Sequence, residues 1–421
     1  MRILFVSHGY PPHETAGVEQ HTRTLAHALD KKGATVGVFS ATRSIGNLQL
    51  EMFVEQDGPI DLWRIVNNIP TRSLSEGESS PQIDKCFKEV FNLFKPDVIH
   101  IQHTQFLSTT LPLEVPSVMT LHDGWLWCSA GGTMLQKGKP CPNPDENSCP
   151  QCTAKWRPQL PNRGKRLIRT AEYLSKLIST QTLHRYWKRL PNSVRKYYST
   201  EQNLKEPESK EAWHRRQTQF LKLAQKCTKI ISPSKYLANR AEQLGFPKAT
   251  VIKHWCSERR QHIGGSGFLF LGTLSYHKGP DLISEAHHEA FHDTDVPIQF
   301  FGSGTLDLPY HTPNPPLPNH MVFEHLQRAD ALVMGSRWPE NAPLVINEAR
   351  SVGCPIVAPK IGGIPELVEH GVDGLLFEPN NKESLKSALR SALSYDFNVR
   401  PPPTKDDQVN QYLSLYRSII Q

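Results

Sequence analysis

The stretch that decides the fold reads PENAPLVINEA over residues 339–349 and continues as GCPIVAPKIGGIPE over residues 353–366. Its pattern predicts a loop, a short helix, a buried strand and a glycine-rich turn. Pro343 marks the helix start, because proline is favoured in the first helical turn. The N–H groups of Leu344 and Val345 would then be free at the positive end of the helix, an arrangement suited to a diphosphate.

The residues around this helix suggest a ligand larger than a phosphate. Glu348, about one turn into the helix, could accept hydrogen bonds from a ribose diol. Glu340, in the loop before the helix, could reach a sugar beyond the phosphates, and Gly363 would let the backbone approach such a ligand closely. The alternative is a solvated helix N-terminus whose acidic residues only complement the helix dipole.

Strand-like and helix-like patterns alternate along most of the chain, in two blocks. Short apolar runs predict strands over Arg2–Ser7, Ala34–Phe39, Asp97–Gln102, Pro116–Leu121, Lys229–Ser232, Phe268–Gly272, Pro297–Phe301, Ala331–Gly335 and Pro355–Ala358. Apolar residues at helical spacing follow Gly17 and recur over Lys235–Leu244, Pro280–Ala290 and Leu344–Val352. This alternation predicts an α/β fold in which crossover helices connect parallel strands.

The composition is that of a soluble globular protein with more than one domain. The chain has 421 residues, of which 38% are hydrophobic and 21% charged, so disordered and fibrous classes are excluded. A chain of this length predicts two domains. Its apolar runs fall short of the roughly 18 residues that a spanning helix needs. The N-terminal apolar run is too short for a signal peptide, so we expect a cytoplasmic protein.

One segment carries most of the positive charge. Between Lys155 and Lys226 there are 18 Lys and Arg and only five Glu, within a chain whose net charge is +7. Aromatic and aliphatic residues lie among these basic residues at roughly helical spacing, as in helices that lie on anionic lipid. The segment therefore predicts peripheral contact with a membrane, with a solvated helical excursion as the alternative. No nucleic acid is expected, because no recognised nucleic-acid-binding module accompanies the charge.

Four cysteines, Cys128, Cys141, Cys149 and Cys152, fall close together in a segment rich in Gly, Pro, Asn and Asp. A Cys-x2-Cys pair with two further thiols suits a closed tetrahedral zinc site, which would give this loop a fixed shape. Four thiolates would leave the metal no open position, so its role would be structural. Unmetallated packed thiols and an iron–sulfur cluster are the alternatives.

The stretch over residues 339–366 closely resembles the donor-site signature of family 4 glycosyltransferases, which have the GT-B fold. Glu340 and Glu348 have the spacing of that signature, and the glycine pair ending at Gly363 follows in the expected place. The resemblance covers residues 1–125 and 228–395, about 70% of the chain. It implies two Rossmann-like domains with parallel sheets that face each other across a cleft.

The resemblance also implies roles for residues outside that stretch. Lys278 matches the lysine that holds the donor diphosphate, whereas Thr273 stands where the family has arginine, so Arg337 is a candidate substitute. Gly302 and Gly304 match a turn near the donor base and sugar. Gly17 matches one glycine of a pair that in the family lies near the donor phosphates and the acceptor. His122 matches a histidine at the end of a strand that in the family also lies near the donor phosphate and the acceptor.

From these matches we predict that His122, Lys278 and Glu340 are catalytic. The predicted donor-binding residues are Gly17, Gly302, Gly304, Arg337, Leu344, Val345, Glu348 and Gly363. The expected domains are 1–227 for the acceptor, with a Cys-rich loop over 128–152 and a basic insertion over 155–226, and 228–395 for the donor. Residues 396–421 are expected to form a helix that packs back on the first domain.

The function implied is a retaining glycosyltransferase of hexosyltransferase type that uses a nucleotide-sugar donor. The acceptor would be a saccharide or a lipid-linked molecule, in bacterial polysaccharide, lipopolysaccharide or glycolipid assembly on the inner face of the membrane. The resemblance implies no cofactor at the reaction centre. A nucleotide-sugar epimerase or hydrolase on the same fold is one alternative, and a catalytically weak scaffold protein is another.

Overall fold

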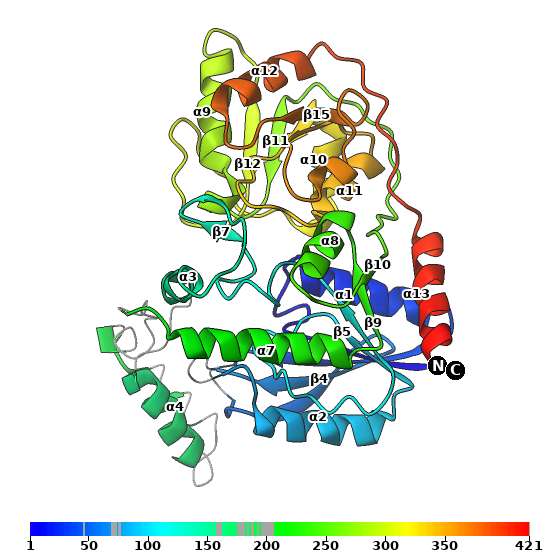
Figure 1. The fold of residues 1–421 in the computed structure, drawn as a ribbon. Helices are drawn as coiled ribbons and strands as arrows, with labels where there is room; N and C mark the ends of the chain where they lie inside the picture. Colours follow the sequence, from blue (N-terminus) through cyan, green and yellow to red (C-terminus); the bar gives the residue numbers. More distant parts are fainter. Residues whose placement is uncertain are drawn as a thin grey trace.

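The computed structural model describes residues 1–44, 47–68, 74, 77–156, 162–174, 182, 185–186, 189–191, 193–194 and 206–420. Two open sheets organise the chain (Figure 1). The first has the strand order β10-β9-β6-β5-β1-β2-β4-β3 and the second the order β12-β11-β13-β14-β15. Neighbouring strands are parallel throughout both sheets, except that β3 pairs with β4 in the antiparallel sense. The predicted α/β fold with two parallel sheets is confirmed.

The strands of the first sheet are β1 (Arg2–Ser7), β2 (Thr35–Thr42), β3 (Met52–Asp57), β4 (Ile60–Val66), β5 (Val98–Ile101), β6 (Ser117–Thr120), β9 (Lys229–Ser232) and β10 (Ala249–Val251). Those of the second are β11 (Phe268–Leu271), β12 (Ile298–Phe301), β13 (Ala331–Val333), β14 (Ile356–Pro359) and β15 (Gly374–Phe377). A separate hairpin, β7 (Leu135–Gln136) with β8 (Lys139–Pro140), belongs to the Cys-rich loop.

Helices accompany both sheets. The helices up to the end of the first sheet are α1 (Gly17–Asp30), α2 (Pro81–Phe94), α3 (Cys149–Trp156), α4 (Asn162–Leu174), α7 (Lys210–Lys226) and α8 (Lys235–Gln243). Those that follow are η1 (Tyr276–Lys278), α9 (Pro280–Phe291), α10 (Asn319–Arg328), α11 (Leu344–Ser351), η2 (Ile364–Glu366), α12 (Lys382–Ala392) and α13 (Lys405–Ile420).

The first sheet is covered by helices on both faces, which explains why β5 and β6 are buried at every position and β1 at every position after Arg2. In β1, Ile3 and Phe5 lie in a core cluster with buried residues of α1 and α13. Leu4 and Val6, which alternate with them, lie in a second cluster with α2, α7 and α8. The carboxyl end of β1 is therefore held rigidly at the centre of a three-layer arrangement.

The second sheet is layered in the same way. Phe268 and Phe270 of β11 pack with α9 and α12 on one face. Leu269, between them in sequence, packs with α10 and α11 on the other face. Helix α11 thus begins at the carboxyl end of its sheet, where the phosphate groups of ligands bind in open parallel folds.

The boundary between the two sheets differs from the predicted boundary at 227/228. Strands β9 and β10 continue the first sheet, since β9 pairs with β6 and β10 with β9. The chain first enters the second sheet at β11, so the crossing lies between Val251 and Phe268. Strand β10 has only three residues at a sheet edge, which is why the apolar pattern did not assign it.

The last helix returns to the first sheet. Val409, Tyr412, Leu413 and Tyr416 of α13 are buried in the cluster that α1 shares with β1. Tyr416 Oη lies 2.6 Å from Nδ1 of His100, a buried histidine of β5. Figure 1 shows α13 lying beside α1, close to the N-terminus of the chain. The two halves are therefore joined by two crossings of the backbone.

The basic insertion is described only in part. Helix α4 carries Arg163 and Lys165, which are half-buried, and Arg166, which is exposed. The predicted basic pair Arg195–Lys196 lies outside the described residues. Among the helices that the structure does describe, each is too short or too polar to cross a lipid bilayer.

Candidate active site

The two sheets meet through loops that leave their carboxyl ends. Asn341, in the loop after β13, donates hydrogen bonds from Nδ2 to the carbonyl oxygens of Leu121 (3.0 Å) and His122 (2.9 Å), directly after β6. Its Oδ1 accepts a hydrogen bond of 2.5 Å from Ser234 Oγ, at the start of α8. Asn341 is buried, so these hydrogen bonds fix the donor-side loop against the edge of the first sheet.

Two helix N-termini converge beside this contact. Gly17 opens α1 and Leu344 opens α11, and a Cβ placed on Gly17 would lie 3.9 Å from Leu344 Cδ1. The residues before them, Ala16 and Pro343, provide no side-chain cap. The first N–H groups of a helix have no partner within the helix, and together they favour an anion. The pair forms a cradle with positive potential from both halves of the molecule.

Lys278 and Glu340 form an ion pair at the donor side of this cradle. Lys278 Nζ lies 2.6 Å from Glu340 Oε1, which also accepts a 2.8 Å hydrogen bond from Ser336 Oγ. Glu340 is buried, and the Lys278 side chain keeps 26% of its exposure. The two residues predicted to be catalytic on this side are thus in contact, and an incoming phosphate would compete with the carboxylate for the ammonium group.

Arg337 does not take the place of the missing arginine in this arrangement. Its guanidinium forms a bidentate ion pair with Asp281 at 2.7 and 2.8 Å, and it also donates to Tyr276 O and Asn380 Oδ1. Arg337 is only 7% exposed, so these contacts commit it to holding η1 and α9. Thr273 itself is exposed. The geometry therefore does not favour Arg337 as a diphosphate ligand.

Glu348 lies one turn into α11, as its predicted role requires. Burial raises the pKa of its carboxyl group to about 7. Near neutral pH the group would be partly protonated, so it could donate as well as accept a hydrogen bond. Such a group suits the two hydroxyls of a ribose, which are themselves both donors and acceptors.

His122 belongs to a cluster of histidines that sequence analysis did not assemble. Its Nε2 lies 2.7 Å from Gln102 Oε1, so Nε2 carries the proton and Nδ1 is the acceptor. The rings of His21 (5.4 Å) and His254 (5.9 Å) lie beside it, and these two rings are 4.1 Å apart. Within the described residues, His21 Nε2 and His254 Nδ1 are buried without a hydrogen-bond partner.

Burial keeps this cluster uncharged. It lowers the pKa of His122 and of His21 well below the ordinary value, with the neighbouring histidines adding to the effect, and it lowers that of His254 to about 4. Only weak features of the sequence could have indicated His21 and His254. His21 is four residues after Gly17 and so shares its helix face, and His254 follows the short strand β10.

The glycines predicted to approach a ligand have a protein partner as well. A Cβ on Gly363 would lie 2.0 Å from Asn341 O, and one on Gly302 would lie 1.8 Å from Gly272 O. Gly304 has φ 147° and would place a Cβ 2.2 Å from Leu274 O. These positions require glycine because backbone segments pack directly against each other, which brings the loops of the second sheet together at the site.

The described residues do not gather the four cysteines into a group placed to hold a metal ion, and the metal site stays a prediction. Within the described residues, which include all four, no group of three or more His, Cys, Asp or Glu side chains is placed to hold a metal ion. Cys128 packs against the main core of the first sheet, and Cys149 packs against Trp213 and its neighbours. All four are free thiols, and burial raises the pKa of each. Packing, one of the alternatives, fits this geometry.

Two α/β halves joined at the carboxyl ends of their sheets define the GT-B class of fold. Solved structures of that class match the whole chain. Sucrose-phosphate synthase from Thermosynechococcus elongatus has a TM-score of 0.64 at 13% identity, covering 99% of this chain and 98% of the other. HepE from Anabaena, in complex with UDP and glucose, has a TM-score of 0.56 at 15% identity, covering 99% and 100%.

Two family models match the sequence. Residues 15–139 match the model for glycosyltransferase family 4, and residues 315–403 match that for glycosyl transferases group 1. The chain belongs to the glycosyltransferases of this group 1 and family 4 type, which confirms the resemblance.

Curated relatives are similar over shorter segments. A glycosyltransferase from Methanocaldococcus jannaschii is 28% identical over 38% of this chain and 48% of its own length. D-inositol 3-phosphate glycosyltransferase from Geodermatophilus obscurus is 30% identical over 30% of this chain and 33% of its own length. The matched segments thus span between a third and a half of these relatives.

Proposed function

We propose that this protein transfers a sugar from a nucleotide-diphosphate donor to an acceptor hydroxyl, with retention of the anomeric configuration. The observation that carries the proposal is the convergence of the α1 and α11 N-termini beside Lys278. A diphosphate placed there would face two helix ends and an ammonium group. These are the groups that stabilise negative charge on a leaving nucleotide.

The donor would extend along the carboxyl edge of the second sheet. Leu344 and Val345 would donate backbone N–H groups to the diphosphate, and Glu348 would bind the ribose. Gly302 and Gly304 would lie near the base and sugar, and a solved relative of this fold, HepE, is described as a complex with UDP and glucose. This half of the chain would be the donor side, and the first sheet the acceptor side.

In the reaction, the bond between the anomeric carbon and the diphosphate oxygen breaks as the acceptor oxygen bonds to that carbon. The acceptor attacks from the face that the leaving group vacates, and its proton passes to the departing diphosphate, so atoms and charge balance. Lys278 would exchange Glu340 for the diphosphate, which frees Glu340 to bind sugar hydroxyls. His122, neutral and close to the contact between the halves, would hydrogen-bond the donor or acceptor.

A panel of UDP-, GDP- and ADP-sugars would test the proposal. We expect one class of nucleotide to bind in calorimetry and to be released as its sugar is transferred to an offered saccharide. Proton NMR of the first product would show the anomer of the donor retained. Failure of every nucleotide to bind at millimolar concentration would exclude a glycosyltransferase, and inversion would exclude the retaining mechanism. Release of free or epimerised sugar alone, whatever acceptor is offered, would favour the hydrolase or epimerase.

A second candidate, a catalytically weak scaffold, is favoured by one observation. Thr273 replaces the arginine of the family, and Arg337 is committed to Asp281. Of the two basic residues Arg337 and Lys278, Lys278, which contacts Glu340, is then the one left to bind the diphosphate. If nucleotide binds but neither transfer nor hydrolysis occurs, the scaffold is the better description.

We also propose that the acceptor is a saccharide or lipid-linked molecule presented at a membrane. The basic segment that includes α4, with Arg163, Lys165 and Arg166, supports this proposal through its charge. One matched relative is named D-rhamnosyltransferase, from Pseudomonas aeruginosa. Co-sedimentation with vesicles containing anionic lipid, compared with neutral vesicles, would test the membrane contact.

A further inference from the structure

Arg64 is a buried arginine on the first sheet, away from the residues assigned above. It lies on β4 and pairs in register with Ser40 of β2 and Phe53 of β3. Its side chain is fully buried, which is costly for a charged group unless that charge is paired and hydrogen-bonded.

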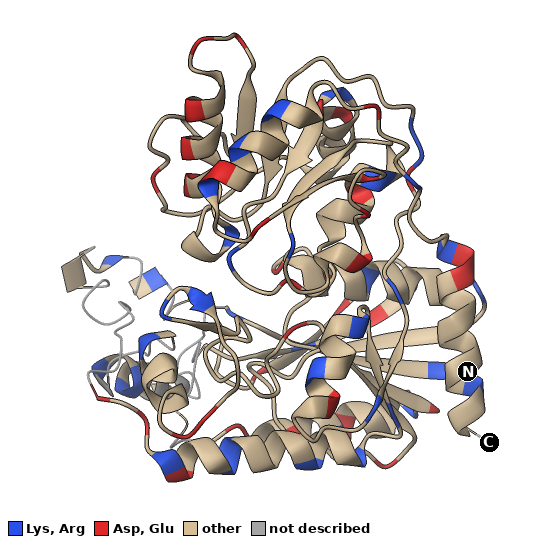
Figure 2. Ribbon diagram, turned by 45° about the horizontal axis from the view of Figure 1, so that its top comes forward, with Lys and Arg blue, Asp and Glu red and all other residues tan. Residues whose placement is uncertain are grey.

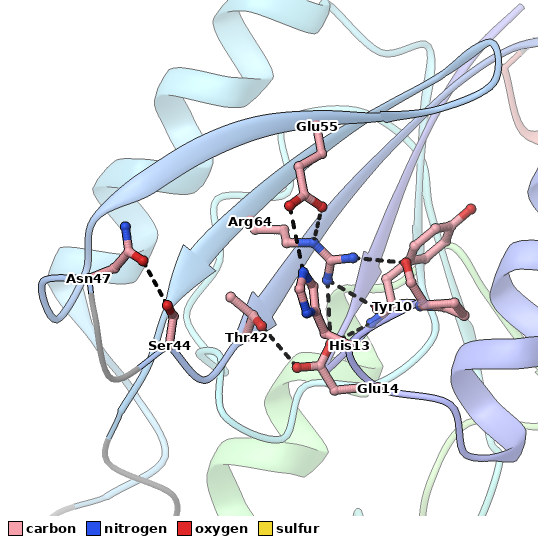
Figure 3. Close-up of polar contacts among 9 residues, drawn as sticks. Tyr10, His13, Glu14, Thr42, Ser44, Asn47, Glu55 and Arg64 are labelled. Atoms are coloured by element: carbon pink, nitrogen blue, oxygen red, sulfur yellow. Dashed lines mark hydrogen bonds and ion pairs between the residues drawn. The ribbon is translucent and has the colours of Figure 1, made fainter. Parts of the chain in front are cut away.

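The guanidinium binds the loop that connects β1 to α1. It donates to the carbonyl oxygens of Tyr10 (3.0 Å) and Pro11 (2.8 Å), and it contacts Glu14 Oε2 at 3.3 Å. A second carboxylate, Glu55 Oε2 on β3, lies 2.6 Å from Nε. Figure 3 shows Arg64 at the centre of these partners, with the loop residues on one side and Glu55 on the other.

Glu14 closes the loop on itself. Its Oε1 accepts a 2.9 Å hydrogen bond from Thr42 Oγ1, and its Oε2 accepts one of 3.3 Å from the backbone N–H of Tyr10 (Figure 3). A Cβ on Gly9 would lie 2.8 Å from Glu14 Cβ, so the turn is tightly packed. The loop over residues 8–16 is thus held by a carboxylate within it and a guanidinium beneath it.

The side chain of Tyr10 adds a second attachment. Its hydroxyl donates a 3.1 Å hydrogen bond to Asp57 Oδ2, and Asp57 is held in turn by Arg23 at 2.7 and 2.8 Å and by His27 at 2.8 Å. Arg23 holds the pKa of the Asp57 carboxyl well below its usual range. Both ends of Tyr10 are therefore fixed by charged groups, which is unusual for a surface loop.

This loop leads directly to the cradle. Gly17, the first residue of α1, follows it in sequence and lies opposite Leu344 of α11. His8, at its other end, lies 2.9 Å from Glu19 Oε1, on the first turn of α1. Displacement of the loop would therefore move the α1 N-terminus relative to α11.

We propose that Arg64 is a positioning residue for the transfer reaction, which fixes the loop over residues 8–16 and thereby the half of the diphosphate cradle that α1 supplies. This inference rests on the proposed function for its effect on turnover. Arg64 touches neither donor nor acceptor. Its role is to keep the two helix ends at the separation that the leaving diphosphate requires, and a misplacement of about 1 Å in such a site can cost up to roughly 100-fold in rate.

The test compares Arg64→Gln and Arg64→Lys with a matched control, Arg400→Gln. Arg400 pairs with the buried carboxylate of Asp373, directly before β15 and away from the loop, so its substitution also breaks an arginine–carboxylate ion pair. Thr42→Val is a milder variant, which removes one hydrogen bond to Glu14 without leaving a buried charge. For each variant we would measure melting temperature, UDP affinity, release of UDP from UDP-sugars with water as acceptor, and amide hydrogen exchange.

We expect Arg64→Gln to speed exchange in the peptide covering residues 8–16 and to lower kcat by about 10- to 100-fold, with a smaller loss of UDP affinity, because α11 and Lys278 would still hold the diphosphate. Arg64→Lys should lower kcat less than Arg64→Gln does, and Thr42→Val should lower it less than Arg64→Lys does. Arg400→Gln should lower the melting temperature without the fall in kcat. A fall in melting temperature alone in Arg64→Gln, or unchanged exchange in residues 8–16, would overturn the proposal.

The two proposals fail in different ways. If wild-type protein binds no nucleotide, the proposed function is wrong, and the exchange experiment still decides whether Arg64 fixes the loop. If Arg64→Gln does not fold, Thr42→Val carries the comparison, because it loosens Glu14 without removing a charge. An unchanged kcat and unchanged exchange in Thr42→Val would then count against the inference.

Discussion

The first-sheet side and the second-sheet side of the candidate site hold their functional groups in different ways. On the first-sheet side, the loop over residues 8–16 is fixed by Arg64, and the histidines near it are uncharged. On the second-sheet side, the site holds charge directly, in the pair of Lys278 with Glu340. If the proposed function holds, the first side would contribute shape, neutral hydrogen bonding and the α1 N-terminus, whereas the second would contribute the ammonium group that stabilises the leaving group.

Figure 2 shows that charge is also distributed unequally outside the candidate site. Basic residues gather on the described part of the insertion that contains α4, and acidic and basic residues are mixed over α9 and α12. Lys382 and Lys386 of α12 pair there with Glu289 of α9. Ion pairs near the surface contribute little to the free energy of folding, and these pairs lie outside the candidate site.

The largest effect that would break the comparison is expected for Lys278. Lys278→Ala removes the ammonium group where charge develops on the diphosphate, so we expect kcat to fall by about 100- to 1,000-fold. Release of nucleotide from the preferred donor measures it. Lys386→Ala, which removes a lysine paired with Glu289 on α12, is the control and should keep wild-type activity. A loss of less than threefold in Lys278→Ala would place the main electrostatic stabilisation elsewhere.

A smaller effect is expected where the two sides join. Asn341→Asp would place a carboxylate oxygen against the carbonyl oxygens of Leu121 and His122, so we expect the free energy of unfolding to fall by about 1–3 kcal/mol. Urea denaturation measures this loss. The same substitution at Asn381, which caps α12, should be nearly neutral because aspartate is an equally good N-cap. Equal effects at the two positions would show that the contact between the sides is not specific.

The smallest effect concerns the pH dependence that Glu348 adds. Its pKa is raised from the ordinary value of about 4.5 to about 7 in the folded protein, so the folded state retains the proton over this interval while the unfolded state loses it. The contribution of Glu348 to stability should therefore fall as pH rises from about 4.5 to about 7 and stay constant above, by at most about 3 kcal/mol and by less because the side chain is only partly buried.

Denaturation of Glu348→Gln at a series of pH values isolates this contribution. The difference in stability between wild type and Glu348→Gln should change across that interval, and Glu324→Gln, at an exposed residue of α10, should show no comparable change. A difference that stays flat from pH 4.5 to 7 would show that Glu348 is well solvated. Glu348 would then be ionised near neutral pH and could only accept hydrogen bonds from the ribose hydroxyls.

Much of the fold was predictable because buried parallel strands are continuous apolar runs. Strands β1 and β9 have the predicted bounds, and α11 begins at Leu344 as the pattern indicated. Strands β3, β4, β10 and β15 were missed, since they are short, lie toward sheet edges or mix polar with apolar residues. The predicted boundary at 227/228 differs from the point where the chain passes between the sheets, because the apolar run of β9 does not indicate which sheet the strand joins.

The site was predictable only where it is local in sequence. The spacing of Glu340 and Glu348 could be read directly, and the structure places both at the expected end of the second sheet. The partner of Arg337, Asp281, is 56 residues away, and His122 is 219 residues from the amide of Asn341 that binds its carbonyl oxygen. Contacts at such separations depend on how the sheets are assembled, which spacing along one chain does not specify.

The return of α13 to the first sheet has a mechanical consequence. The backbone passes from one sheet to the other between Val251 and Phe268, and passes back between α12 and α13. A body joined to another at two points can turn easily only about the line through both points. Because Tyr416 fastens the helix after the second crossing to His100 of the first sheet, any rotation of one half relative to the other would be constrained to the line through the two crossings.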